Sequence, residues 1–186
     1  MIPDQELIDN YEGFKIVLKK ILPKTLGFED FEIRNMEVLF ICNDGNDNFL
    51  LEAASGGISA IIDMAWQIYM FSTKEKTDFT VIIDEVENHL HTTMQRQILH
   101  DLLNAFPSAN FIVSTHSPLI VNSVRESNIF VLQYNEDNKI ISEKLDLLNQ
   151  AKTATEILDE VLGVSDRKST RLNSSHVALS RMPSSA

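Results

Sequence analysis

The sequence contains one cysteine, no long apolar run and an excess of acidic residues, and each of these facts narrows the kind of protein that it encodes. Cys42 has no second cysteine with which to form a disulfide, a usage typical of a reducing, cytoplasmic setting. No apolar run reaches the roughly 18 residues that a membrane span requires, and the acidic N-terminus lacks the basic and apolar regions of a signal peptide. We therefore expect a cytoplasmic protein with no membrane segment.

The charge balance argues against one class of partner. The net charge of −11 over 186 residues leaves no excess of Lys and Arg from which to build a broad basic face for nucleic acid. Contact with DNA through a partner, or through regions beyond this segment, stays open. The length is enough for one domain with a hydrophobic core.

The end of the chain, residues 166–186, differs in composition from everything before it. It is rich in Ser and Arg and shows little apolar periodicity. The peptide DRKSTRLNSSH, which begins this segment, resembles the translation of a common short-read sequencing adapter. We therefore predict that 166–186 is an artefactual or disordered tail, and that the natural protein comprises 1–165 and continues beyond it.

Strands alternate with helices along residues 1–165, which predicts an α/β fold with a parallel sheet. A small β-hairpin is expected in the first third of the chain, because an Asp-Gly turn at 44–45 separates two apolar segments. The apolar periodicity predicts helices over 4–22, 58–72, 89–105, 119–124 and 152–162. It predicts strands over 31–41, 49–53, 79–84, 110–114, 128–135 and 139–145.

Two of the predicted strands end in polar side chains. The first runs directly into Asp84 and Glu85, and the second ends in Ser-Thr-His-Ser at 114–117. Ligands of open α/β sheets bind beyond the carboxyl ends of the strands, so neighbouring strands would bring His116 close to Glu85. Mg²⁺ prefers hard oxygen ligands and shares the phosphates of a nucleotide. The pattern therefore favours a site in which Asp84 holds magnesium and Glu85 orients or deprotonates an attacking water.

Simpler interpretations of the same residues remain open at this stage. Acids at a strand end can be solvated or salt-bridged, a lone histidine is more often structural than catalytic, and Ser-Gly-Gly can be an ordinary loop. A metal-hydrolase site built from His89, His91, His116 and Asp84 is a further alternative. It is disfavoured because two histidines at the start of a helix, two positions apart, diverge, and no cysteine joins them.

The order of the motifs resembles a known family. ASGGIS at 54–59 precedes a predicted helix, and FTVIIDEVENHLH at 79–91 and FIVSTHSP at 111–118 follow. This order is similar to the second half of an ABC-type ATPase head, with a signature loop, a Walker B strand, a D-loop and a switch histidine in turn. Over residues 48–134 it most resembles stand-alone prokaryotic AAA/ABC-like ATPases related to overcoming-lysogenization-defect and DNA-repair ATPases. The resemblance implies a partial P-loop NTPase-like parallel sheet with flanking helices.

The resemblance also implies a role for each motif residue, with ATP and Mg²⁺ as cofactors. The signature loop would contact the γ-phosphate of ATP held by a second head, in a homodimer. Glycine lets backbone N–H groups approach phosphate, and the following helix offers its positive end. The implied residues are Asp84 for magnesium, Glu85 and His116 for catalysis, and Ser55, Gly56, Gly57, Asn88 and His89 for binding nucleotide or lining the dimer seam.

One motif of such an ATPase is absent, since no G-x-x-x-x-G-K-[ST] phosphate loop occurs in the chain. Ala54, Ile58 and Thr92 also stand where relatives commonly have Leu, Gln or Glu, and Pro. We therefore predict the C-terminal lobe of an ATPase domain, inactive alone, whose missing regions lead to an effector nuclease or DNA in a repair or phage-defence system. The alternative is a non-catalytic module that dimerises or donates its signature loop to a partner ATPase.

Overall fold

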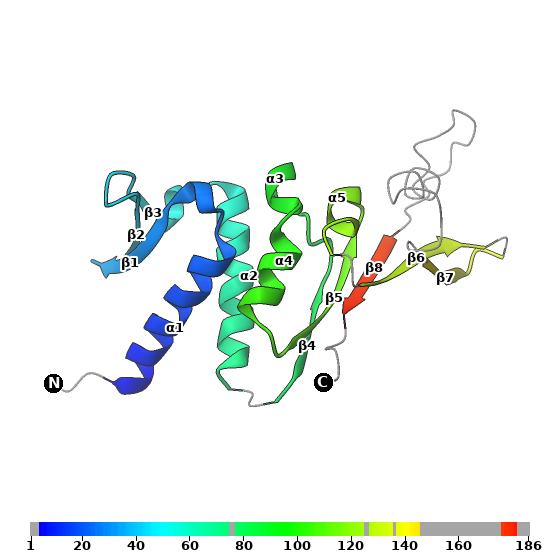
Figure 1. Cartoon of the computed structure of the whole chain (residues 1–186), viewed down its shortest axis with the longest axis horizontal. Helices are drawn as coiled ribbons and strands as arrows, with labels where there is room; N and C mark the ends of the chain where they lie inside the picture. Colours follow the sequence, from blue (N-terminus) through cyan, green and yellow to red (C-terminus); the bar gives the residue numbers. More distant parts are fainter. Residues whose placement is uncertain (1–3, 75–76, 125–126, 136, 146–175, 182–186) are drawn as a thin grey trace.

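The computed structural model describes residues 4–74, 77–124, 127–135, 137–145 and 176–181, so the helix predicted over 152–162 lies outside the described residues. The N-terminal helix and a small sheet lie to one side of a larger sheet, and α2 and α4 stand between them (Figure 1). The described helices include none long and apolar enough to cross a membrane. In chain order the elements are α1 (Gln5–Ile21), η1 (Lys24–Leu26), β1 (Phe28–Arg34), β2 (Glu37–Cys42), β3 (Phe49–Leu50), η2 (Leu51–Ala53), α2 (Gly56–Ser72), β4 (Phe79–Ile83), α3 (Thr92–Gln95), α4 (Ile98–Ala105), β5 (Ala109–Thr115), α5 (Pro118–Val121), β6 (Asn128–Tyr134), β7 (Ile140–Leu145) and β8 (His176–Arg181).

The larger sheet has the strand order β4-β5-β8-β6-β7. β4 and β5 run parallel with Ile82 opposite Ile112, which confirms that these two predicted strands are neighbours. β6 and β7, the strands predicted over 128–135 and 139–145, pair antiparallel. β8 lies between β5 and β6 and runs antiparallel to both. Its residues belong to the segment 166–186 that resembles a translated adapter, and the artefactual origin of that segment stays a prediction.

The hydrophobic core lies between the helices and one face of β4 and β5. Alternate residues of a strand point to opposite faces, so every second residue of β5 is buried there. On the other face, Ile82 is 76% exposed and its neighbour Ile112 is 40% exposed. The side chains at the centre of the core include Leu18, Ile61, Ile98, Leu102 and Val113.

The N-terminal sheet corrects one prediction, because residues 31–41 do not form a single strand. β1 and β2 are antiparallel strands joined by a turn at Asn35 and Met36. Both turn residues have positive φ, 51° and 67°, as a two-residue type I′ hairpin requires. Methionine does not favour positive φ, so the residue type of Met36 does not predict this turn. β2 also pairs with β3, which confirms the predicted hairpin around the Asp-Gly turn.

The region 89–105 also differs from its prediction as one helix. His89 has a φ of 66°, which is incompatible with a right-handed helix. His91 instead caps the separate helix α3 by accepting a backbone N–H two residues on, at 3.4 Å. α3 ends at Gln95, and α4 begins at Ile98. The apolar spacing continues through the break, because Met94 of α3 packs partly buried against the core that α4 covers with Ile98 and Leu102.

Burial controls the chemistry of Cys42, which is 0% exposed at the end of β2. Burial raises the pKa of its thiol above the ordinary value, and the carboxylates of Asp47 and Glu29 add to the rise. Because the thiolate is the reactive form, we expect Ellman's reagent to modify the folded protein at least about 100-fold more slowly than the urea-unfolded chain. Labelling at the unfolded rate under native conditions would contradict this burial.

Candidate functional site

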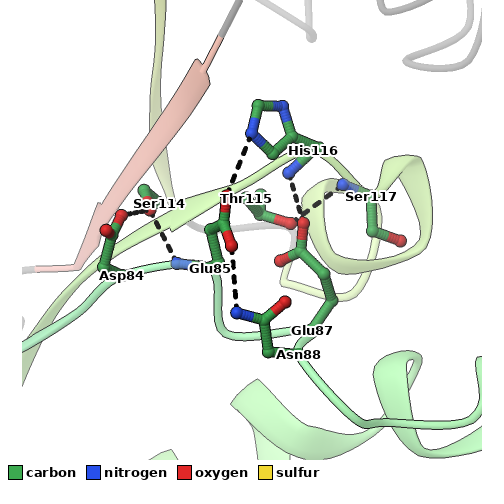
Figure 2. Close-up of polar contacts among 8 residues, drawn as sticks. All are labelled: Asp84, Glu85, Glu87, Asn88, Ser114, Thr115, His116 and Ser117. Atoms are coloured by element: carbon green, nitrogen blue, oxygen red, sulfur yellow. Dashed lines mark hydrogen bonds and ion pairs between the residues drawn. The ribbon is translucent and has the colours of Figure 1, made fainter. Parts of the chain in front are cut away.

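The ends of β4 and β5 meet at the hydroxyl of Ser114 (Figure 2). Residues 84–88, which follow β4, are called here the acid turn, and residues 114–117, which end β5, the histidine segment. The Ser114 hydroxyl donates to the carboxylate of Asp84 and accepts the backbone N–H of Glu85 at 2.8 Å. Because the two strands are parallel and in register, one side chain can hold both chain ends together.

Glu85 adopts a conformation that few side chains tolerate. Its φ of 48° is left-handed, a region that costs a non-glycine residue on the order of 1 kcal/mol or more. Its carboxylate points toward the histidine segment (Figure 2). One oxygen lies 3.6 Å from Nε2 of His116, and the other accepts the side-chain amide of Asn88 at 2.9 Å. Such strain persists only where surrounding contacts impose it, and here the bond to Ser114 does so.

Glu87 bonds to the backbone of the residue that carries the imidazole. Its Oε1 accepts the N–H of His116 at 2.5 Å, while its Oε2 is buried and has no hydrogen-bond partner among the described residues. Thr115 is fully buried, and its hydroxyl accepts the N–H of Ser117 at 3.0 Å. Ser117 in turn donates to the side chain of Gln95 in α3 at 2.7 Å. The histidine segment is therefore bonded to the acid turn on one side and to α3 on the other.

Residues 55–57, called the signature loop after the motif that they resemble, begin α2. Ser55 is the N-cap, and its hydroxyl accepts a backbone N–H of the first turn at 3.4 Å. Gly56 is exposed, and nothing lies within 4 Å of the position that a Cβ would take there. Gly57 is buried, and a Cβ on it would lie 3.1 Å from the carbonyl oxygen of His89. Glycine at this position lets α2 start directly against the chain leaving the acid turn.

The groups at the strand ends suit a hard cation and an anion. Asp84 is exposed and supplies carboxylate oxygen, the ligand type that Mg²⁺ takes. A groove of about 470 Å³ between α2 and the outer edge of β4 ends at this residue. The part of the chain that the structure describes contains no group of three or more His, Cys, Asp or Glu that could hold a metal by itself. A cation at Asp84 would therefore take most of its ligands from phosphate and water.

The structure gathers the sequence-predicted site residues into two groups. One is a bonded group that Ser114 completes: Asp84, Glu85, Asn88 and His116. The other lies at the start of α2: Ser55, Gly56, Gly57 and His89. Sequence reasoning assigned no role to Ser114 or Glu87. Their signals were a serine ending a buried strand and a third acid close after two others, and neither signal shows which backbone group the side chain binds.

The family match, together with the fold, identifies the chain as an AAA-like ATPase domain. Residues 8–122, more than half of the chain, match the family described as "AAA domain, putative AbiEii toxin, Type IV TA system". The chain belongs to this family. The match contains both groups of site residues.

Curated relatives are named as Septu and retron proteins. Septu protein PtuA of Bacillus mycoides (strain KBAB4) is 36% identical over 100 residues, which cover 51% of this chain and 14% of the relative. The retron Ec83 probable ATPase of Escherichia coli is 26% identical over 115 residues, 58% of this chain and 21% of the relative. The retron Vc95 probable ATPase of Vibrio cholerae serotype O1 biovar El Tor is 44% identical over 52 residues, 28% of this chain and 10% of the relative. The chain spans less than a quarter of the length of each.

Solved structures with the same fold are SMC ATPase heads. One, from a study of ATP-driven dimerization and DNA-stimulated activation of SMC ATPases, superposes with a TM-score of 0.63 at 19% identity, covering 88% of this chain and 96% of that one. The Smc head domain with a coiled coil from Pyrococcus yayanosii gives a TM-score of 0.58 at 20% identity, covering 84% and 29%. At these identities the likeness shows the fold alone. The chain has the mixed α/β fold of P-loop ATPase heads, which confirms the predicted fold class.

The two glycines of the signature loop form a matched pair for testing the contact with the acid turn. Gly56→Ala places its Cβ in open space and should raise the free energy of unfolding by roughly 0.5–1 kcal/mol, because alanine favours a helix over glycine. Gly57→Ala should lose this gain and lower stability, because its Cβ would press on the carbonyl of His89. Urea unfolding measures both values. An equal gain at both positions would show that α2 does not start against this carbonyl.

Proposed function

We propose that this chain is the part of an ATP-binding, ATP-hydrolysing ABC-class ATPase that carries the signature loop, the Walker B strand, the D-loop and the switch histidine. The observation that carries the proposal is the convergence of Glu85 and His116, 3.6 Å apart, at the ends of two parallel strands. Acids at a merely solvated strand end would need neither the left-handed backbone of Glu85 nor the bonds that impose it. Membership of an AAA-domain family supports the same conclusion.

In this proposal the acids and the histidine divide the work of hydrolysis. Glu85 orients the attacking water and accepts its proton, with Asn88 holding one carboxylate oxygen in place. His116 contacts the γ-phosphate from the end of the neighbouring strand β5. Asp84 would hold Mg²⁺, whose chemistry is to neutralise charge on the phosphates. The donor set fits this ion, since an exposed carboxylate at the end of a groove leaves room for phosphate oxygens and water.

The signature loop acts on the nucleotide of a second head. Ser55 and Gly56 are exposed at the N-terminus of α2, where free N–H groups and the helix dipole attract an anion. The contact between Gly57 and His89 brings the end of the acid turn to the same surface, so that Asn88 and His89 would line the seam. A homodimer of heads is the proposed arrangement. The study of ATP-driven dimerization in SMC ATPases, whose fold this chain shares, supports it.

The complete protein supplies the phosphate loop that this chain lacks. The chain spans less than a quarter of its Septu and retron relatives, which leaves room there for that loop and for other domains. We place the protein in a phage-defence or DNA-repair system, with an effector nuclease or DNA contacted through regions outside this chain. Its single, buried cysteine fits a cytoplasmic location.

A second candidate function is a non-catalytic module that dimerises or donates its signature loop to a partner ATPase. The absence of a phosphate loop from the chain favours it. The strained backbone of Glu85 and its contact with His116 favour the enzyme, because a module that only donates a loop has no use for them. The flanking gene sequence discriminates the two: an upstream phosphate loop restores the enzyme.

Glu85→Gln in the full-length gene product tests the proposed chemistry. The amide keeps the length of the side chain and removes the base, so the Kd for ATP should stay within about threefold while turnover falls at least about 100-fold. Fluorescent ATP-analogue binding and phosphate release measure the two quantities. Glu37→Gln, at an exposed position of β2, is the matched control and should change neither. Unaltered turnover in Glu85→Gln would overturn the assignment of the base.

The chain by itself should neither bind ATP tightly nor hydrolyse it. It lacks the loop of backbone N–H groups and the lysine that hold the β- and γ-phosphates in such enzymes. Phosphate release by the purified chain should equal that of buffer at ATP concentrations up to about 1 mM, the top of the usual KM range. Release above buffer that disappears in Glu85→Gln would show that the phosphates are held by residues present here.

A further inference from the structure

Glu87 is an acid in the acid turn for which the proposed hydrolysis has no use. Its side chain is half-buried, and its Oε1 accepts the backbone N–H of His116 at 2.5 Å. We propose that Glu87 is a positioning residue that sets the His116 imidazole against the carboxylate of Glu85. The inference rests on the proposed ATPase function. The contact between Glu87 and His116 can nevertheless be tested in this chain without nucleotide.

The position of the imidazole depends on the backbone just beyond β5. The strand ends at Thr115, so His116 is the first residue outside it. The carboxylate of Glu87 accepts the N–H of this first residue and so continues the attachment of the chain beyond the strand. Hydrogen bonds to an ionised group are roughly twice as strong as bonds between neutral groups. The Glu87 bond therefore holds the first residue beyond the strand to the acid turn, while the following residue, Ser117, bonds to Gln95 of α3.

Two hydrogen bonds hold the chain around His116 to the acid turn, one at Ser114 and one at His116 itself. The Ser114 hydroxyl holds the acid turn to β5 before the histidine, through the N–H of Glu85. Glu87 holds the histidine itself, after the strand. Between these two attachments the imidazole Nε2 faces the Glu85 carboxylate at 3.6 Å (Figure 2). The Ser114 bond by itself holds only the start of the histidine segment. The Glu87 bond then determines the direction in which the chain leaves the strand at His116.

The second oxygen of Glu87 separates a positioning role from one of general stability. Oε2 is buried, and no described residue donates to it. Taking a carboxylate out of water costs free energy, which the single bond to Oε1 offsets only in part. Its place is explained by where Oε1 must lie to reach the N–H of His116. Native chains retain such local costs mainly at functional sites.

The bond depends on the length of the side chain as well as on its charge. Glu87→Asp keeps the charge but is shorter by one methylene, about 1.5 Å, so its carboxylate would fall short of the N–H. Glu87→Gln removes the charge but keeps the length and an acceptor oxygen. If Glu87 positions His116 by reach, the amide replaces it and the shorter acid does not. If only negative charge matters, the order is reversed.

Amide hydrogen exchange in the complete 186-residue chain, followed by NMR, measures the bond directly. The His116 amide should exchange about 10- to 100-fold faster in Glu87→Asp than in wild type, and within about threefold of wild type in Glu87→Gln. The amides of Val113 in β5 and Ser117, whose N–H bonds to Thr115, report whether the fold is intact and should change little. Glu37→Asp, an exposed site in β2, is the matched control.

A double-mutant cycle reports the imidazole itself. In the wild-type background Glu85→Gln should shift the imidazole resonances of His116, because the carboxylate faces Nε2. In the Glu87→Asp background the same substitution should shift them by less than about half as much. Unchanged His116 exchange in Glu87→Asp, or an undiminished response to Glu85→Gln, would overturn the positioning role.

Kinetics of the full-length protein separate this inference from the proposed function. Glu87→Asp should lower kcat by about tenfold and leave KM for ATP within about twofold, with Glu87→Gln near wild type. If the full-length wild-type protein shows no ATP turnover while the exchange results hold, the proposed function fails and the positioning contact stands. If Glu85→Gln abolishes turnover while Glu87→Asp leaves the amide exchange rate of His116 unchanged, the positioning role of Glu87 is wrong and the proposed ATPase function is retained.

Discussion

The site depends on the hydrogen bonds of Ser114. Parallel pairing brings the ends of β4 and β5 level, but nothing in the ladder keeps the two chains together after its last bond. The Ser114 hydroxyl does so by donating to Asp84 while accepting the N–H of Glu85, and the Ser114 carbonyl accepts the N–H of Val86 at 3.2 Å. This attachment holds the backbone at Glu85, whose φ of 48° is left-handed and whose carboxylate lies 3.6 Å from His116.

The acid turn is also held from the core side. Val86 and Leu90 are 1% and 6% exposed, so apolar side chains anchor the chain at both ends of its polar stretch. Between them Glu87 reaches the histidine segment, and the carbonyl of His89 meets the start of α2. The acid turn and His89, which follows it, therefore contact both groups of site residues. This short irregular segment keeps a defined conformation because the apolar packing of its buried residues and the hydrogen bonds of its polar residues stabilise the same backbone path.

The apolar patterns predicted most of what positions the site. The runs before Asp84 and Ser114 predicted β4 and β5, and their end residues predicted the approach of Glu85 to His116. The hairpin at Asn35 was missed because Met36 gives no local signal for a left-handed turn, and the break after Gln95 because local propensity alone does not set it. The helical spacing through 89–105 persists although the helix does not. The bonds of Glu87 were also beyond sequence reasoning, since its partner is a backbone group far along the chain.

The left-handed backbone of Glu85 limits how this position can vary in descendants of the chain. By conformation alone, glycine, asparagine and aspartate are the residues that tolerate a φ of 48°. None of them has the reach of glutamate, and branched residues are barred at the β-carbon. A substitution here can remove the strain of the left-handed backbone, or it can keep a carboxylate within reach of the imidazole of His116. No natural side chain does both. Substitution at this position would replace a strained backbone that carries a carboxylate near His116 with a relaxed turn that lacks this contact.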